Sequence, residues 1–432
     1  MGIRSMLRLH YCPLALSIMA TLAFAGDPGA PGEERGLAIK AAKVLAVPAE
    51  GQQVFDNAVV LVKDGRITEV GPQASTAIPE GWETIDVGER WLAPGMIDLH
   101  NHVAGSLGDL NDMVYLTNPG LRASSIVSPR NAAVQRGLAG GVTSLLLIPG
   151  SGTNIGGQGV LVKVGHPEYE KGEIRNPGSL KLAQAGNPER YLIGVGRSFM
   201  NWNTRDTFER GVAYAKRWEA HERDGGERPE VNPQFEVFRP LYAKEAQVST
   251  HTQMYQVVMM TVLMIKQELG IDVYIDHGTF DGWRAASLAE AAKVPAILGP
   301  RNIDVPSRRF IDWTGSNPER IQGVAAGYQD MGHTMIGFNT DAPVIPAEEL
   351  FFQASMGVRY GFRWDELQSV RGLTIVPALA AGIADRVGSL EAGKDADILI
   401  IDGDPADPRR GIDAVLVDGV RVYDAERDGR RF

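Results

Sequence analysis

The sequence contains one cysteine among 432 residues and no long run of basic residues. A single cysteine excludes a scaffold held together by disulfide bonds. Nucleic acid is not an expected partner, because the formal net charge is −10 and binding a phosphate backbone requires clustered Lys and Arg. With 44% hydrophobic and 22% charged residues, the composition also excludes a disordered or collagen-like chain and indicates a folded globular protein.

An apolar run near the N-terminus, Pro13–Phe24, is shorter than the roughly 20 helical residues that span a bilayer core. It follows Arg4 and Arg8 and ends in Ala23-Phe24-Ala25, a pattern typical of signal-peptide cleavage sites. We therefore expect a signal peptide over 1–25, a flexible lead over 26–36, and a protein that is exported to a bacterial periplasm or the cell exterior without stable membrane insertion. An uncleaved membrane anchor is the alternative. Cys12 lies in this segment, so the mature chain would have no thiol.

Both ends of the remaining chain are predicted to form β-structure. Residues 37–91 contain short strands around Asp64-Gly65, a hairpin signal, and residues 381–432 repeat the pattern around Asp418-Gly419. Over 92–380, strand-like apolar runs alternate with helical patterns such as Met254–Leu269, which predicts βα repetition with a parallel sheet. The polar stretch His221–Asn232 is expected to be a solvated loop. The sequence thus predicts an α/β domain flanked by a smaller β domain made from both chain ends.

Four of the eight histidines lie at the carboxyl ends of predicted strands, where barrel proteins build their active sites. Two of them form the motif His100-Asn101-His102, in which the alternation of an extended strand points both imidazoles to the same side. The other two are His251 and His277. Such a set indicates a metal site, and four buried histidines without metal are the alternative.

The sequence around these histidines resembles the amidohydrolase superfamily of metal-dependent hydrolases. The His-x-His motif follows Ala93–Leu99, and the resemblance continues in register through the four segments Ser249–His251, Ile275–Gly278, Gly337–Asp341 and Val387–Asp397. It covers nearly the whole mature chain and implies a distorted (β/α)8 TIM barrel with a small β-sandwich built from both chain ends.

The resemblance also implies the ligands of a catalytic divalent metal. His100, His102 and Asp341 would bind the ion, with His251 and His277 as further ligands, or with His277 polarising the substrate carbonyl. Zn²⁺ is the expected ion, although Fe, Mn, Co and Ni accept the same donors. Such a site generates a hydroxide near neutral pH, and Asp341 would carry its proton to the departing nitrogen.

The chain departs from the superfamily pattern at the group that bridges two metals. Gly186 stands where relatives carry a Glu in a Gly-Glu-Asn-Pro-Lys-Arg segment, and glycine has no side chain. Lys163 and Lys181 are candidate carboxylated substitutes, although each is more commonly an ordinary lysine. One metal is therefore expected rather than two.

The resemblance predicts hydrolysis of a carbon–nitrogen bond in a non-peptide or cyclic amide, or in a small dipeptide-like substrate. Arg301, at the end of a predicted strand, is a candidate anchor for a substrate carboxylate, and a structural salt bridge is its alternative. A deaminase and a non-catalytic binding barrel are the rival functions. The sequence leaves the substrate open, and it leaves open whether the protein is a homo-oligomer.

Overall fold

The computed structural model describes residues 36–105, 110–300, 302–304, 321–363 and 365–429. The predicted signal peptide and Arg301 lie outside these ranges, and the lead lies outside them apart from Gly36. Within the described ranges, no helix is both long enough and apolar enough to span a bilayer.

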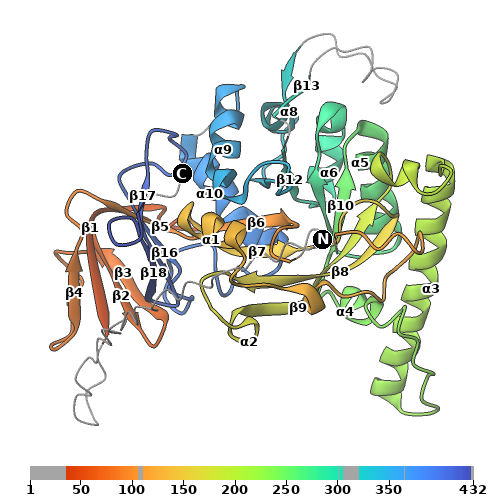
Figure 1. Cartoon of the computed structure of the whole chain (residues 1–432), viewed down its shortest axis with the longest axis horizontal. Coiled ribbons are helices and arrows are strands. Elements are labelled where there is room, and N and C mark those ends of the chain that lie inside the picture. The colour runs from red at the N-terminus through yellow and green to blue at the C-terminus, as the bar shows by residue number, and fades with distance from the viewer. Residues whose placement is uncertain (1–35, 106–109, 301, 305–320, 364, 430–432) are drawn as a thin grey trace, which may run out of the picture. The chain divides into compact units, whose positions relative to one another are not determined.

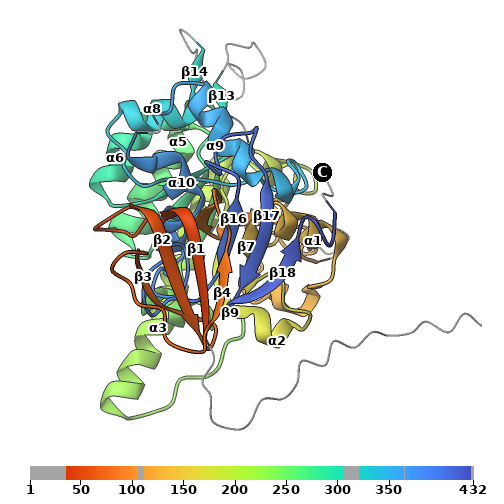
Figure 2. The same cartoon turned by 90° about the vertical axis from the view of Figure 1, so that its left-hand side faces the viewer.

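Strands from both chain ends form one eight-stranded sheet, here called the terminal sheet (Figures 1 and 2). Its strands are β1 (Leu37–Leu45), β2 (Val54–Lys63), β3 (Arg66–Pro72), β4 (Glu83–Asp86), β5 (Trp91–Pro94), β16 (Ile398–Ile401), β17 (Ile412–Val417) and β18 (Val420–Asp424). The two ends meet where β5 pairs antiparallel with β16. Both predicted hairpins are present, since β2 pairs with β3 and β17 with β18. Asp64 and Asp418 adopt the positive φ that such two-residue turns require.

A second eight-stranded sheet forms a nearly closed barrel. Its strands, in order, are β6 (Met96–Asn101), β7 (Val142–Leu147), β8 (Ile155–Lys163), β9 (Glu173–Ala183), β10 (Val248–Thr252), β11 (Val273–His277), β12 (Ala296–Leu298) and β15 (Ile336–Phe338). A single bridge between Asn101 and Ala342 links the first strand to the segment after the last. The predicted distorted TIM barrel is confirmed.

The barrel departs from uniform βα repetition at β8, which pairs antiparallel with both β7 and β9. The cause is the connection from β7 to β8: residues 148–154 contain no helix, and a short loop between neighbouring strands produces an antiparallel hairpin. The carboxyl end of β8 therefore lies at the opposite end of the barrel from the carboxyl ends of the other seven strands.

Helices surround the barrel strands, and a short two-stranded ribbon projects from them (Figure 1). The α-helices are α1 (Ala132–Ala139), α2 (Tyr169–Gly172), α3 (Arg197–Asp224), α4 (Phe238–Tyr242), α5 (Tyr255–Thr261), α6 (Ala286–Ala291), α8 (Val324–Asp330), α9 (Leu350–Arg359), α10 (Gln368–Leu373) and α11 (Ile375–Ala380). The other elements are the 3₁₀ turns η2 (Ala123–Ile126), η3 (Asn187–Arg190), η5 (Phe280–Ala285), η6 (Ala347–Glu349) and η7 (Asp365–Leu367), the π-helix η4 (Val262–Glu268), and the ribbon β13 (Ile303–Asp304) with β14 (Gln322–Gly323).

The loop predicted over His221–Asn232 begins later than expected, because α3 continues to Asp224. The buried residues of this helix include Phe208, Val212 and Trp218, so a buried apolar face supports a helix whose exposed end is polar.

The terminal sheet is held to the barrel by a buried lysine. The Nζ of Lys163, at the end of β8, lies 2.8 Å from a carboxylate oxygen of Asp395 and 3.1 Å from one of Asp397, and it also pairs with Asp418. Lys163 and the first two aspartates are almost completely buried. Burial opposes the charged form of the lysine, but the carboxylates outweigh it and raise the pKa of Lys163. This ion cluster therefore links the barrel to the C-terminal strands.

Candidate metal centre

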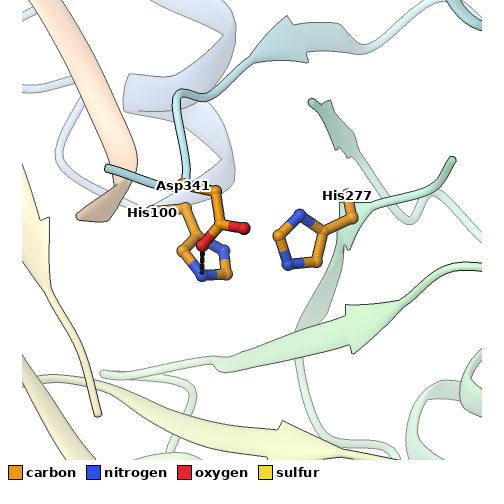
Figure 3. Close-up of side chains that lie close together, drawn as sticks. All are labelled: His100, His277 and Asp341. Carbon is orange, nitrogen blue, oxygen red and sulfur yellow. Dashed lines mark ion pairs between the residues drawn. The ribbon is translucent and has the colours of Figure 1, made fainter. Parts of the chain in front are cut away.

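Four histidines and one aspartate converge at the carboxyl ends of the barrel strands. His100 lies in β6 and His102 directly follows it, His251 lies in β10, His277 ends β11, and Asp341 follows β15. The Nε2 of His100 lies 3.0 Å from the Nε2 of His102 and 3.2 Å from a carboxylate oxygen of Asp341. Figure 3 shows the Asp341 carboxylate beside His100, with His277 facing both. Ligand atoms of His100, His277 and Asp341 lie within 4.8 Å of one another, as the ligands of one metal ion would.

Each histidine has its Nδ1 close to an oxygen atom, which fixes the ring. The Nδ1 of His102 donates to the carbonyl of Ile148 at 2.8 Å, and the Nδ1 of His277 donates to the carbonyl of Gly299 at 2.8 Å. A carbonyl only accepts, so these two nitrogens carry the proton and each Nε2 of the neutral ring keeps its lone pair. Histidines that bind metals commonly donate their other ring nitrogen to an oxygen in this way.

His100 and His251 are held by side-chain oxygens instead. The Nδ1 of His100 lies 2.6 Å from a carboxylate oxygen of Asp276, and the Nδ1 of His251 lies 2.7 Å from the Oγ of Ser151. The Nε2 atoms of His251 and His277 are buried without a hydrogen-bond partner among the described residues. An unpartnered buried nitrogen is costly unless something binds it. The donor set therefore fits a divalent metal ion.

Burial keeps most of these rings uncharged. It lowers the pKa of His102, and it lowers the pKa of His251 further. Burial, assisted by the charge of His100, lowers the pKa of His277 to about 4. His100 differs, because the carboxylate of Asp276 outweighs the effect of burial and raises its pKa. Neutral imidazole is the form that binds a metal.

Asp341 carries the negative charge of the cluster. Burial alone would raise its pKa, but the neighbouring imidazoles, above all His100, which also donates a hydrogen bond, hold the pKa of this carboxyl far below its usual range. Its side chain is 18% exposed, whereas those of His100 and His277 are fully buried. Asp341 is therefore the most accessible of these three side chains, and it is ionised.

The backbone is strained at two of these residues. His277 has a φ of 77° and Asp341 a φ of 51°, both in the left-handed region that costs non-glycine residues roughly 1–3 kcal/mol. The adjacent Gly299, whose carbonyl holds His277, could not carry a side chain, because a Cβ there would lie 2.3 Å from the carbonyl oxygen of Asn339. The fold thus maintains unfavourable local conformations at the ends of the strands that carry the candidate ligands.

The structure places the two lysines proposed as bridging groups at opposite ends of the barrel. Lys181 lies near the end of β9, is completely buried, and its Nζ lies 3.2 Å from the Nε2 of His100 and 3.9 Å from a carboxylate oxygen of Asp276. Burial lowers the pKa of Lys181, which favours a neutral amine. Lys163 ends the antiparallel strand β8 and belongs to the ion cluster at the other end of the barrel. Lys163 is therefore not a candidate bridging group.

Gly186 contributes nothing to the cluster, because it has no side chain. It precedes η3 with a φ of 81°, beyond the end of β9.

A cavity of about 360 Å³ adjoins the cluster, with His102, Met113, Arg122, Ile148 and Pro149 among its lining residues. Its size is at the lower end of the range for small-molecule sites.

Sequence reasoning missed Ser151 and Asp276, which orient His251 and His100. Ser151 lies in a Gly-Ser-Gly segment that reads as an ordinary turn, and only the strand order brings it to His251. Asp276 had a detectable signal, since it immediately precedes His277. In a strand its side chain points away from that of His277, and here that direction leads to the Nδ1 of His100.

The fold and the cluster together define a barrel protein with a candidate metal centre at the carboxyl ends of its strands. A family model described as "Amidohydrolase family" matches residues 321–422. Over 90% of its length the chain superposes on all of the solved amidohydrolase from Thermotoga maritima MSB8, with a TM-score of 0.78 and 28% identity. These matches support the assignment of the chain to the amidohydrolase superfamily.

Two curated relatives match most of this chain. Amidohydrolase tasK of Hapsidospora irregularis is 28% identical over 403 residues, which are 84% of this chain, but the chain spans only 40% of that protein's length. An imidazolonepropionase of Rhizobium rhizogenes is 25% identical over 389 residues, covering 81% of this chain and 88% of the relative.

Proposed function

We propose that the protein is a metal-dependent hydrolase that cleaves the carbon–nitrogen bond of a small non-peptide or cyclic amide. The observation that carries this proposal is the convergence of four imidazole nitrogens and one ionised carboxylate beside a small cavity. The names of the relatives, amidohydrolase and imidazolonepropionase, support the same reaction class.

His100, His102, His251, His277 and Asp341 would hold the ion, which when bound lowers the pKa of a coordinated water to about 7. Asp341 accepts a proton from the attacking water as the new carbon–oxygen bond forms. It then delivers that proton to the nitrogen as the carbon–nitrogen bond breaks, so the leaving group departs as a neutral amine or amide. The ionised state and partial exposure of Asp341 suit this role.

For His277 we propose the role of a ligand rather than a group that polarises the carbonyl. Polarisation by hydrogen bonding needs a proton on Nε2. Its Nδ1 proton is already committed to the carbonyl of Gly299, so a second proton would make the ring cationic. With a pKa of about 4, His277 is neutral at pH 7 and its Nε2 is a lone-pair donor.

We also propose that Lys181 binds a second ion after reaction with CO₂. The neutral amine attacks the carbon of CO₂, a nitrogen–carbon bond forms, one proton leaves the nitrogen, and the resulting carbamate supplies two oxygen donors. The support is positional, because the Nζ of Lys181 lies beside His100 at the same end of the barrel. A second ion departs from the single metal that the sequence favours.

The metal is tested first, by elemental analysis of the purified protein after reconstitution with Zn, Mn, Fe, Co or Ni. We expect at least one equivalent of ion in the wild type and its loss in His102→Ala, because a ligand is removed. The matched control His221→Ala, on α3, should retain the metal. Hydrolysis of amides, lactams and cyclic imides is then screened. Failure of every ion to bind would refute the proposed function.

The role of Lys181 is tested by Lys181→Met, which keeps the length of the side chain but cannot react with CO₂. We expect the metal content to fall from about two equivalents to about one, and bicarbonate to speed the reconstitution of the wild type only. Lys266→Met, at a lysine paired with Asp272 outside the barrel mouth, is the control. Equal metal content in wild type and Lys181→Met would show that Lys181 is no bridge.

A further inference from the structure

The two edges of the barrel sheet, β6 and β15, meet without a ladder of backbone hydrogen bonds. Within the described ranges, one bridge between Asn101 and Ala342 joins the two backbones. It includes a hydrogen bond from the amide of His102 to the carbonyl of Ala342 at 3.0 Å. We call this junction the seam. His100 and His102 lie on its β6 side and Asp341 on its β15 side, so three of the five candidate ligands lie across a join with little backbone pairing.

The carboxylate of Asp98 bridges the seam. Its Oδ1 accepts hydrogen bonds from the backbone amides of His100 and Thr340, both at 3.3 Å. Its Oδ2 accepts from the Nδ2 of Asn101 at 3.2 Å and from the Oγ1 of Thr340 at 2.6 Å. Asp98 is completely buried. Each oxygen therefore binds one donor from each side of the seam, which a carboxylate can do because it offers about four acceptor positions.

The two side chains that donate to Asp98 also close turns around candidate ligands. The Oδ1 of Asn101 accepts from the amide of Val103 at 2.9 Å. The Oγ1 of Thr340 accepts from the amide of Ala342 at 3.1 Å. Each bond spans the one residue between its partners, and in both cases that residue is a candidate ligand. The backbone at these ligands is thus tied to Asp98 from both sides of the seam.

A metal ion requires closer control of this spacing than neighbouring strands provide. Paired strands lie about 4.8 Å apart, whereas a nitrogen or oxygen ligand must lie about 2.0–2.2 Å from zinc. The Nε2 of His100 and a carboxylate oxygen of Asp341 are 3.2 Å apart, a separation that two ligands of one ion can have. A small shift of one side of the seam would carry Asp341 away from an ion bound by His100 and His102.

We propose that Asp98 is a positioning residue, which holds the two sides of the seam at the spacing where His100, His102 and Asp341 bind one ion. This inference rests on the proposed function, because it takes an ion to be bound there. Asp98 acts through the backbone, since both of its oxygens are occupied by hydrogen-bond donors. The alternative is that Asp98 stabilises the barrel without affecting the ligands.

The test is the Kd for Zn²⁺ of Asp98→Asn, measured by competition with a chelator. Asparagine has the same shape, but its NH₂ group cannot accept two of the four hydrogen bonds. We expect the Kd to rise about 10–100-fold, as it does for other residues that orient metal ligands without touching the ion. The d–d absorption of the Co²⁺-loaded protein should also change, because the ligand geometry changes. A role in stability alone would leave that spectrum unaltered.

Thr340→Val tests the same network from the other side of the seam, and it serves if Asp98→Asn does not fold. It removes the hydroxyl that donates to Asp98 and keeps the shape of the side chain. We expect the Kd for Zn²⁺ to rise about 10-fold. Thr340→Ser keeps the hydroxyl and should retain the wild-type Kd and the wild-type Co²⁺ spectrum.

Asp397→Asn is the matched control, because it makes the same change at a buried aspartate that pairs with Lys163 at the far end of the barrel. It should lower the Tm and leave the Kd for Zn²⁺ and the Co²⁺ spectrum unchanged. An unchanged Kd in both Asp98→Asn and Thr340→Val would overturn the proposal, and so would an equal rise in Asp397→Asn.

Amide hydrogen exchange of the metal-free protein separates this proposal from the proposed function. The amides of His102 and Ala342 should exchange faster in Asp98→Asn than in the wild type, because the seam opens locally. Equal exchange rates in the two proteins would show that Asp98 does not hold the seam. A wild type that binds no ion would refute the proposed function, and the exchange measurement would still decide whether Asp98 joins the two edges.

Discussion

Asp341→Asn is expected to lower kcat by about 10³-fold or more for any amide that the wild type hydrolyses. Asn cannot accept the proton of the attacking water, and general acid–base catalysis contributes roughly 10²–10⁴-fold. Loss of the ionised carboxylate also removes a candidate metal ligand. The measurement is steady-state kinetics at pH 7 together with the metal content of each sample, so that lost ligation and lost proton transfer are distinguished.

Asp330→Asn is the control for this experiment. Asp330 pairs with Arg363 at the surface, and its side chain is 55% exposed. The kcat of the Asp330→Asn variant should therefore stay within about twofold of the wild-type value. If Asp341→Asn kept more than a tenth of the wild-type kcat with full metal content, proton transfer by Asp341 would be disproved. Another group would then have to accept the proton of the attacking water.

Lys163→Met is expected to have the largest effect on stability. Removing the amine leaves the buried carboxylate of Asp397 without its cation, whereas Asp395 keeps its pairs with Arg386 and Arg66, and breaking a buried pair costs about 3–5 kcal/mol. At about 2.1 cal/mol/K per residue, that loss lowers the Tm by roughly 4–6 °C. Thermal unfolding followed by circular dichroism measures it.

Lys171→Met is the matched control, because this lysine forms an exposed pair with Glu168. The substitution should lower the Tm by about 1 °C or less. Equal Tm values for Lys163→Met and the wild type would show that the ion cluster contributes nothing to the attachment of the terminal sheet. Metal content is measured in parallel, and we expect it to be unchanged in a folded Lys163→Met protein, since Lys163 lies at the far end of the barrel.

The sequence predicted the candidate ligands because each lies where an apolar strand ends, and parallel strands bring their carboxyl ends together. The match is clear for β11, which ends at His277, where the sequence predicts the end of a strand. The same reasoning could not choose between Lys163 and Lys181, since both lie in strand-like apolar segments. The choice depends on the direction of β8. That direction follows from a connection between β7 and β8 that contains no helix, and no pattern in the sequence indicates this.

Contacts made by oxygen atoms were harder to predict than the ligands. Ser151 reaches His251 across 100 residues of sequence, and Asn339 holds Asp276 across 63. Hydroxyls and amides of this kind occur throughout any chain, so only the three-dimensional packing reveals which of them orient a functional histidine. The long helix α3 was also missed, because its mostly polar surface weakens the periodic pattern that marks a helix.

The ion cluster of Lys163 also affects when the barrel can fold during synthesis of the chain. Asp397 lies 234 residues after Lys163, and Asp418 lies 255 residues after it. At about 5–20 residues per second, the ribosome makes Asp397 roughly 10–50 s after the lysine. Until then the end of β8 can be buried only by desolvating an unpaired ammonium, which costs several kcal/mol. The barrel is therefore expected to complete its packing only when the last strands have left the ribosome, so that barrel and terminal sheet fold as one cooperative unit.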